Sequence, residues 1–322
     1  MPDTAAKIDV VIPSWNGRDL LAECLQSLAA QMFREFNTLV VDDASTDGTT
    51  EMVRERFPWA GLLRREVNGG FCAAVNDGIA KASADFVFLL NNDITLHPEC
   101  LERLFAAGEQ TGAGMLAPLI LWRGEPGVIY SAGDRQRRNG RPEAVGFGVP
   151  AEGFSYPAEV FGVSAAAALY RREVFDRIGL FDAKFGTYYS DSDVSFRARL
   201  AGCQAAFVRE AVAWHVGSAS LAGSTLRRTF ECCVNHTLLV VKNMPAPLIP
   251  RYTPHIMAER LHQIRRLWSA ARAERGAVFA TAQVAAAGGR VLRLWPHALR
   301  ERRRIQRARR VSAAEINRLL SP

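Results

Sequence analysis

The chain has 322 residues, of which 48% are apolar and 23% charged, a composition typical of globular proteins and not of disordered or fibrous ones. No uninterrupted apolar stretch approaches the roughly 18 to 20 residues that a membrane-spanning helix requires, so we expect any membrane contact to be peripheral. The net charge of +7 is unevenly distributed, since residues 1–224 carry 21 basic and 28 acidic side chains, whereas residues 225–322 carry 19 and 5.

This charge distribution divides the chain into an acidic part, net −7, and a basic part, net +14. A strongly basic region favours an anionic partner, and both a membrane surface and a nucleic acid meet that description; a solvated helical surface is the alternative. The six cysteines show no CxxC spacing, and the first residues lack a basic and then apolar leader. We therefore expect a reducing, cytoplasmic location.

The first hundred residues alternate between strand-like and helix-like patterns. Apolar runs predict strands at 8–12, 36–41, 61–65 and 86–90, and the segments between them predict helices over 20–33, 49–57 and 71–82. Strands that alternate with helices of this length are typical of βαβ units. We predict an α/β fold with a doubly wound, mostly parallel sheet that is covered on both faces.

The pattern changes after residue 115, where short segments are separated by Gly and Pro. The polar stretch 133–148 predicts an inserted loop region. Further along, the sequence predicts a strand within 161–170, helices over 172–178 and 193–201, and a strand at 205–208. Because the chain becomes helical and basic after residue 224, we predict an α/β domain over residues 1–224 and a basic helical region over residues 225–322.

Polar side chains follow the predicted strands directly. Asn91, Asn92 and Asp93 come after the buried run FVFLL. Ligands of open α/β sheets bind beyond the carboxyl ends of the strands, so these residues face the expected crevice. A carboxylate there is a suitable ligand for Mg²⁺ or Mn²⁺ held against a diphosphate, although Asn and Asp after a strand also make turns.

Two further clusters are suited to a nucleotide. Asp42 and Asp43 follow the second predicted strand, where a carboxylate can accept hydrogen bonds from a base or a ribose, or can instead serve the turn and the next helix cap. The segment from Asn68 to Phe71 opens a helix, and its glycines let backbone N–H groups approach an anion. The absence of GxGxxG argues against a nicotinamide-dependent enzyme.

Acidic residues also precede the predicted helix at 193–201. Asp191 and Asp193 lie in YYSDSDVSFRARL, and Phe196 and Leu200 are spaced to face inward. One of the two carboxylates could remove a proton from an acceptor hydroxyl, or both could stabilise the helix N-terminus. His215, after the strand-like AVAW, is a candidate metal ligand or a structural histidine.

Taken in order, seven segments resemble the inverting family 2 glycosyltransferases with the GT-A fold, in particular the bacterial rhamnosyltransferase-like group that builds cell-surface polysaccharide. The segments are IPSWNG, VDDASTDGT, NGGFCAAVNDGI, LLNNDITLHPE, YRREVFDRIGLFD, YYSDSDVSFRARLAG and WHVGS, over residues 8–220. The resemblance implies a nucleotide-diphospho-sugar donor and a divalent cation (Mg²⁺ or Mn²⁺) held by Asp93 and His215. It implies that Asp191 is the catalytic base, and we expect Asp193 to share part of the catalytic work. The implied nucleotide-sugar contacts are Pro13, Trp15, Asn16, Asp42, Asp43, Asn68, Gly70, Phe71, Asn76, Asn91 and Asn92.

The sequence departs from this family pattern near the expected acceptor site. Ser190 stands where the family usually has Glu, which makes Asp193 a substitute for part of that work. Ala165 stands where Gly is common, and its methyl group would narrow the acceptor pocket. Asn91 occupies the first acidic position of the metal motif, which leaves Asp93 to carry the charge.

The basic region ends in a dense run of arginines, seven in the eleven positions 300–310, preceded by Leu292, Leu294, Trp295 and Leu299. This mixture suits the headgroup region of an anionic leaflet, where each basic side chain contributes about 1 kcal/mol. A lipid-linked acceptor would be reached at the inner face of the cell membrane. No nucleic-acid recognition motif is present, so we do not expect a nucleic-acid partner.

Together these features predict a metal-dependent inverting glycosyltransferase that acts on a lipid-linked or polysaccharide hydroxyl. The resemblance makes thymidine-diphosphate-rhamnose the first candidate donor. Ser190 and Ala165 motivate an alternative, a catalytically silent protein that binds nucleotide sugars or acts as a scaffold. A nucleotidyltransferase is a third alternative, against which the lack of an early Gly-rich triphosphate loop argues.

Overall fold

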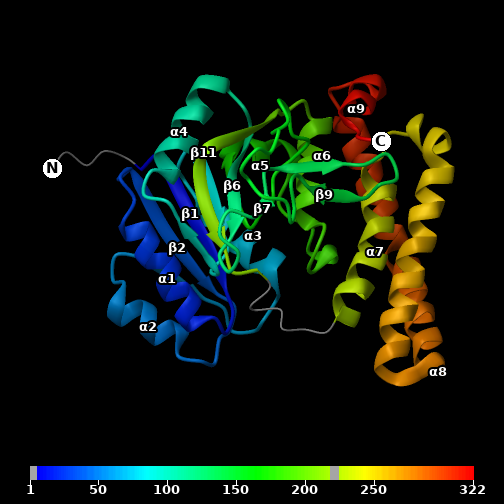
Figure 1. Ribbon diagram of the computed structural model, residues 1–322, viewed down its shortest axis with the longest axis horizontal. Helices are drawn as coiled ribbons and strands as arrows, with labels where there is room; N and C mark the ends of the chain where they lie inside the picture. Colours follow the sequence, from blue (N-terminus) through cyan, green and yellow to red (C-terminus); the bar gives the residue numbers. More distant parts are fainter. Residues whose placement is uncertain (1–5, 218–224) are drawn as a thin grey trace.

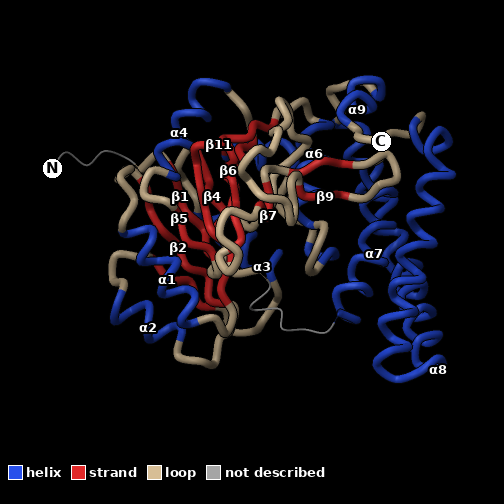
Figure 2. The backbone as a smooth tube through the Cα atoms, viewed as in Figure 1, coloured by secondary structure: helices blue, strands red, loops and turns tan. Residues whose placement is uncertain are grey.

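The computed structural model describes residues 6–217 and 225–322. A sheet flanked by helices forms one part of the molecule, and the C-terminal helices stand beside it (Figure 1). Figure 2 shows the strands gathered in the α/β part and long helices dominating the other. The predicted division at residue 224 and Ser218 of the WHVGS segment lie outside the described residues.

The first half of the sheet is parallel, in the spatial order β3-β2-β1-β4. Within it, Val10 packs with α1 on one face and Val11 packs with α3 on the other, because successive side chains of a strand point to opposite faces. The prediction of a doubly wound half is confirmed. The elements are β1 (Ile8–Ser14), α1 (Arg18–Ala29), β2 (Phe36–Asp42), α2 (Thr49–Arg56), β3 (Gly61–Arg64), α3 (Phe71–Lys81) and β4 (Phe86–Leu90).

The second half of the sheet is mixed. Its strands are β5 (Ile94–Leu96), β6 (Met115–Trp122), β7 (Ile129–Ser131), β10 (Ala167–Arg171) and β11 (Ala205–His215). β10 lies antiparallel between β4 and β6, β11 is parallel to β6, and β5 is antiparallel to β11. Ala167, the first residue of β10, pairs with Leu90, the last residue of β4. Because the chain re-enters the sheet at that carboxyl edge, β10 must run backwards, and the expectation of a mostly parallel sheet holds only for the first half.

Several predicted boundaries shift in this half. Of the strand predicted within 161–170, only the last residues form a strand, β10. The helix predicted over 193–201 begins three residues earlier, as α6 (Ser190–Leu200). The strand predicted at 205–208 continues to His215 past a register shift between Val208 and Val212. The other elements are α4 (Cys100–Thr111), α5 (Arg172–Ile178), a 3₁₀ turn η1 (Ala183–Phe185), and the small β8 (Asp134–Gln136) and β9 (Pro142–Ala144) pair within the predicted loop region.

The basic region forms α7 (Thr225–Asn243), α8 (Leu248–Ala308) and α9 (Ala313–Leu319). The α8 helix loses helical geometry at Arg275 and Gly276, where φ of Gly276 is +83°, and it folds back so that its two halves lie side by side (Figure 1). Phe196 and Leu200 of α6 face inward as predicted and pack with Val240 of α7 and with Met244, which directly follows α7. The helices therefore share a hydrophobic core with the α/β part. Among the described residues, no helix is both long and apolar enough to cross a membrane.

Candidate functional site

A cavity of about 400 Å³ opens where β1 and β4 end, at the N-terminus of α3 and beside the start of α6. This position, beyond the carboxyl ends of parallel strands, is where open α/β sheets bind ligands. Most of the predicted site residues line it, although they come from distant parts of the sequence. These are Pro13, Trp15, Asp43, Asn68, Gly70, Phe71, Asn91, Asn92, Asp93, Asp191 and His215.

Asp93 and His215 form a pair on the cavity wall. The Nε2 atom of His215 lies 3.1 Å from Oδ1 of Asp93, because β11 and β5 pair antiparallel with His215 opposite Ile94. The ring of Tyr130 packs edge-on against His215, with the ring centres 4.3 Å apart. The Nδ1 atom of His215 is buried without a hydrogen-bond partner among the described residues.

This pair fits a divalent cation that takes further ligands from elsewhere. In the described parts of the chain, no three His, Cys, Asp or Glu side chains gather as a complete metal site. Mg²⁺ commonly binds through one or two carboxylates, several waters and substrate phosphates, so an incomplete protein shell is expected for it. Mn²⁺ accepts the same oxygen ligands and also imidazole. Asp93 and His215 therefore meet the requirement for holding a cation against a diphosphate.

Asp43 holds the glycine turn that precedes α3. Its carboxylate accepts hydrogen bonds from the backbone N–H groups of Gly69 at 2.9 Å and Gly70 at 2.8 Å, and pairs with the Arg65 guanidinium. Gly70 has φ of +79°, a left-handed value that suits a residue without Cβ. The interaction fixes the α3 N-terminus beside the cavity, where backbone N–H groups favour anions.

Asp191 lies on the cavity side of the first turn of α6. Its Oδ1 accepts a hydrogen bond from the N–H of Ser192 at 2.8 Å, and its Oδ2 accepts one from the N–H of Ala165 at 3.4 Å. Burial raises the pKa of Asp191 above the ordinary value for an aspartate, although the backbone donors oppose that shift. A carboxylate of raised pKa at a cavity wall is a suitable proton acceptor.

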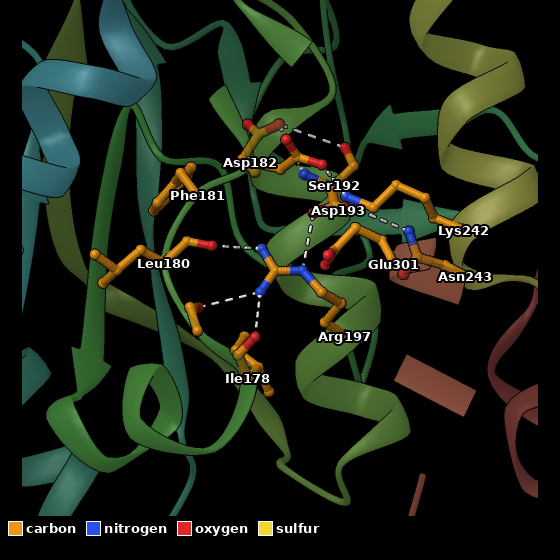
Figure 3. Close-up of polar contacts among 12 residues, drawn as sticks. Ile178, Leu180, Phe181, Asp182, Ser192, Asp193, Arg197, Lys242, Asn243 and Glu301 are labelled. Atoms are coloured by element: carbon orange, nitrogen blue, oxygen red, sulfur yellow. Dashed lines mark hydrogen bonds and ion pairs between the residues drawn. The ribbon is translucent and has the colours of Figure 1, made fainter. Parts of the chain in front are cut away.

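Asp193 does not line the cavity and lies instead among Arg197, Lys242 and Asn243 (Figure 3). It is fully buried, with Arg197 at 2.8 Å from Oδ2, and Lys242 at 2.9 Å and Asn243 at 2.8 Å from Oδ1. Burial alone would raise its pKa, but Lys242 and Arg197 outweigh burial and lower it. The structure thus corrects the expectation that Asp193 shares the catalytic work, because both of its oxygens are committed to neighbouring side chains.

Three predicted nucleotide contacts also lie outside the cavity lining. Asp42 is fully buried and accepts hydrogen bonds from Ser45, Thr50 and Arg64. Asn76 bonds both backbone polar groups of Phe181, at 2.8 and 2.9 Å. The Oδ1 atom of Asn16 accepts a hydrogen bond from the N–H of Thr46 at 2.8 Å. Asp42, Asn76 and Asn16 therefore hold the loops around the cavity and, contrary to expectation, are not part of its lining.

Other cavity residues could not be found from the motifs. Tyr130 comes from β7 and Ser164 from the segment before β10. Thr187 and Tyr188 precede α6, and Arg227 reaches the cavity from α7 in the basic region. No local pattern marks them, apart from the two tyrosines beside Ser190 in the YYSDSD segment. Their convergence depends on how the chain returns to the sheet. Ser190 and Ala165, the positions that depart from the family pattern, both line this cavity.

The family model for glycosyl transferase family 2 matches residues 9–179, more than half of the chain. A curated relative, the N-acetylglucosaminyl-diphospho-decaprenol L-rhamnosyltransferase of Mycobacterium tuberculosis, is 28% identical over 233 residues, which cover 65% of this chain and 75% of that protein. The poly(ribitol-phosphate) beta-glucosyltransferase of Bacillus spizizenii is 32% identical over 105 residues, 31% of this chain and 17% of that protein.

Solved structures show the same fold at lower identity. A mannosyltransferase from Pyrobaculum calidifontis in complex with GDP-Man and Mn²⁺ superposes with a TM-score of 0.56 at 19% identity, covering 95% of this chain and 87% of that one. TarS 1–349 of S. aureus in complex with UDP-GlcNAc gives 0.54 at 20% identity, covering 93% and 92%. These likenesses establish the GT-A fold.

Proposed function

Since the chain belongs to glycosyl transferase family 2 and is a glycosyltransferase, we propose that it transfers a sugar with inversion from a nucleotide-diphospho-sugar to a hydroxyl of a lipid-linked or polysaccharide acceptor. Membership of this family favours an enzyme over a catalytically silent binding protein or a nucleotidyltransferase. One observation carries the proposal, the presence of the Asp93–His215 pair and of Asp191 on the wall of the same cavity.

On the donor side, Asp93 and His215 would hold a divalent cation, and the N-terminus of α3 would face the phosphates. When bound, the cation neutralises the charge that develops on the departing diphosphate. Gly70 lies at that helix terminus and in the cavity lining, and its own N–H donates to Asp43. The N–H groups of the first turn that follow it are the ones that would favour an anion.

On the acceptor side, Asp191 would take the proton of the attacking hydroxyl. The hydroxyl oxygen forms a bond to C1 of the sugar while the bond from C1 to the diphosphate oxygen breaks, and the bonding pair leaves with the nucleoside diphosphate. Attack from the side opposite the leaving group inverts the configuration at C1. The N–H groups of Ser192 and Ala165 orient the carboxylate for this transfer.

The family resemblance makes thymidine-diphosphate-rhamnose the first donor to test. The relative from Mycobacterium tuberculosis is named as an L-rhamnosyltransferase that acts on N-acetylglucosaminyl-diphospho-decaprenol. We test the present chain by thermal stabilisation with a panel of nucleotide sugars, with and without Mn²⁺, and then by transfer to lipid-linked and polysaccharide acceptors. Stabilisation by one donor that requires Mn²⁺, followed by transfer, supports the proposal. The absence of both across the panel contradicts it.

A peripheral contact with an anionic membrane surface is part of the proposal, because α8 exposes an apolar and basic face. Leu292, Trp295 and Leu299 recur on one side of the helix and are 73%, 40% and 36% exposed. Leu294, by contrast, is buried and does not join this face. The exposed Arg293 and Arg300 directly follow Leu292 and Leu299 in the sequence, and together with Lys184, Arg290 and His297 they line a hollow of about 570 Å³. Apolar anchors among cations suit an anionic leaflet.

Vesicle sedimentation tests this contact. We expect the protein to bind phosphatidylcholine vesicles that contain phosphatidylglycerol and not vesicles of phosphatidylcholine alone. The double variant Leu292→Ser and Trp295→Ser should lose binding, whereas Val278→Ser, which alters an 88% exposed side chain elsewhere on α8, should retain it. Equal binding by all three proteins would contradict the assignment of this face.

A further inference from the structure

Asn235 of α7 is held against the segment that leads into α6. The side chain is fully buried, and its Nδ2 atom lies within hydrogen-bond distance of three backbone carbonyl oxygens, those of Phe185 at 2.8 Å, Thr187 at 2.9 Å and Tyr188 at 2.9 Å. An asparagine amide carries two N–H hydrogens, so it must share them among these acceptors. Such a fork fixes the path of four consecutive residues from a single side chain.

That segment has an unusual backbone. Tyr188 and Tyr189 both have φ of +66°, a left-handed conformation that side chains with a Cβ rarely adopt. Residues in such conformations persist where their surroundings determine them, and they concentrate at functional sites. The carbonyl of Tyr189 accepts the N–H of Asp193, which starts the first turn of α6. The conformation of these two residues therefore sets the direction in which α6 begins, and with it the position of Asp191 in the first turn.

A second set of contacts holds α6 independently of Asn235. Lys242 is fully buried and lies 2.5 Å from Asp182 and 2.9 Å from Asp193, and Asn243 donates to Asp193 at 2.8 Å (Figure 3). This cluster anchors the far side of the helix to α7. Because it does not include the 187–189 turn, α6 should remain docked when the contacts of Asn235 are removed.

We propose that Asn235 is a positioning residue, which fixes the turn before α6 and through it the direction of the Asp191 carboxylate. The basic region is then part of the catalytic apparatus and not an appendage, although the matched family model ends at residue 179. The inference rests on the proposed role of Asp191 as the proton acceptor.

Two variants and a control test this role. Asn235→Ala removes all three contacts, and Asn235→Ser retains one hydroxyl donor as a partial replacement. Asn317→Ala is the matched control, because it removes an asparagine whose Oδ1 atom accepts a hydrogen bond from the Tyr252 hydroxyl, between α9 and α8, without touching the turn. Hydrogen exchange of residues 185–193 is measured for each protein, together with kcat and the KM for donor and acceptor.

We expect faster exchange confined to residues 185–193 in Asn235→Ala and a kcat lower by about 100-fold, since small displacements of a reacting group have effects of that order. The donor KM should stay within about twofold of the native value, because Asp93 and His215 are undisturbed. Asn235→Ser should recover part of the kcat, and Asn317→Ala should behave as the native protein. In the Asp191→Asn background, Asn235→Ala should cause little further loss.

The inference is overturned if Asn235→Ala keeps the native kcat, or if kcat and both KM values change only in proportion to unfolded protein. An additional loss of equal size in the Asp191→Asn background would also overturn it, because Asn235 would then act independently of that carboxylate. If the native protein transfers no sugar at all, it is the proposed function that fails, and the hydrogen-exchange result still decides whether Asn235 fixes the turn.

Discussion

The two sides of α6 carry aspartates only two residues apart, yet these have different surroundings. Two residues correspond to about 200° of rotation on a helix, so Asp191 faces the cavity while Asp193 faces the core between α6 and α7. Among the described contacts, Asp191 receives hydrogen bonds from Ser192 and Ala165, and Asp193 is surrounded by Lys242, Arg197 and Asn243. The same residue type therefore has a proposed role in chemistry on one side and forms buried ion pairs on the other.

The pKa shifts of the two carboxylates follow from these surroundings. Burial raises the pKa of Asp191, whereas Lys242 and Arg197 overcome burial and lower the pKa of Asp193. A carboxylate whose charge is not compensated by cations is the better proton acceptor, and one that is fully paired contributes through its ion pairs. Asp→Asn substitutions at positions 191 and 193 should therefore have different effects on activity and on stability.

The largest expected effect is on the cavity side. Asp191→Asn should lower kcat by about 10² to 10⁴-fold, the range typical of a lost general base, while the melting temperature stays close to the native value. Transfer assays and thermal unfolding check this together. Full transfer by the variant would remove Asp191 from its proposed role.

The equivalent substitution on the core side should show the reverse pattern. Asp193→Asn leaves the buried Arg197 without its carboxylate and weakens the site of Lys242, so unfolding should become easier by about 3 to 5 kcal/mol. Denaturant titration measures this loss. Asp19→Asn is the control, because its 83% exposed side chain pairs with Arg18 at the surface and should contribute less than about 1 kcal/mol. A catalytic defect in fully folded Asp193→Asn would contradict the assignment of Asp193 to structure.

A third prediction concerns the donor side of the cavity. Asp93→Asn, His215→Ala and chelation of divalent cations should each weaken donor binding by about tenfold or more, or about 1.4 kcal/mol, with little effect on the ligand-free protein. Calorimetric titration with and without Mn²⁺ checks this expectation. Unchanged, metal-independent donor binding in both variants would rule out the pair as the cation site.

The smallest effect is the pH dependence, which should have opposite signs for the two sides of α6. Asp182, paired with Lys242, and Asp193 have lowered pKa values in the folded state, so their stabilisation is present above the ordinary aspartate pKa and is lost as the pH falls toward the folded values. The raised pKa of Asp191 instead favours folding at low pH, and that contribution disappears as the pH rises through the folded pKa. Each such proton changes stability by at most about 1.4 kcal/mol per pH unit.

The free energy of unfolding is measured between pH 2 and pH 7 for the native protein, Asp193→Asn and Asp191→Asn. Because each substitution removes about one titrating proton, the three curves separate these contributions. The acid loss of stability should be shallower in Asp193→Asn. The acid limb of kcat/KM should lie above the ordinary aspartate pKa of 3.8 if Asp191 must be ionised. An acid limb at or below that value would contradict the role of Asp191.

The sequence by itself predicted the parallel half of the sheet, because apolar runs and helical periodicity are local properties. It also predicted that polar residues after strands would meet at one edge, and Asp43, Asn91 and Asp93 do line the cavity. Family resemblance, more than spacing, identified His215 and Asp191. These residues could be found because strand ends, and motifs that follow one another in a fixed order, can be recognised in the sequence.

Only the tertiary structure decided which of two neighbouring acidic residues faces the cavity. Asp42 and Asp43 are adjacent, and alternation along the strand directs Asp42 into a buried cluster with Arg64. The antiparallel course of β10, the arrival of Arg227 and the contacts of Asn235 depend on segments that are far apart in the sequence. Local patterns determine which elements form, whereas the direction of a side chain and its partners depend on how those elements pack against one another.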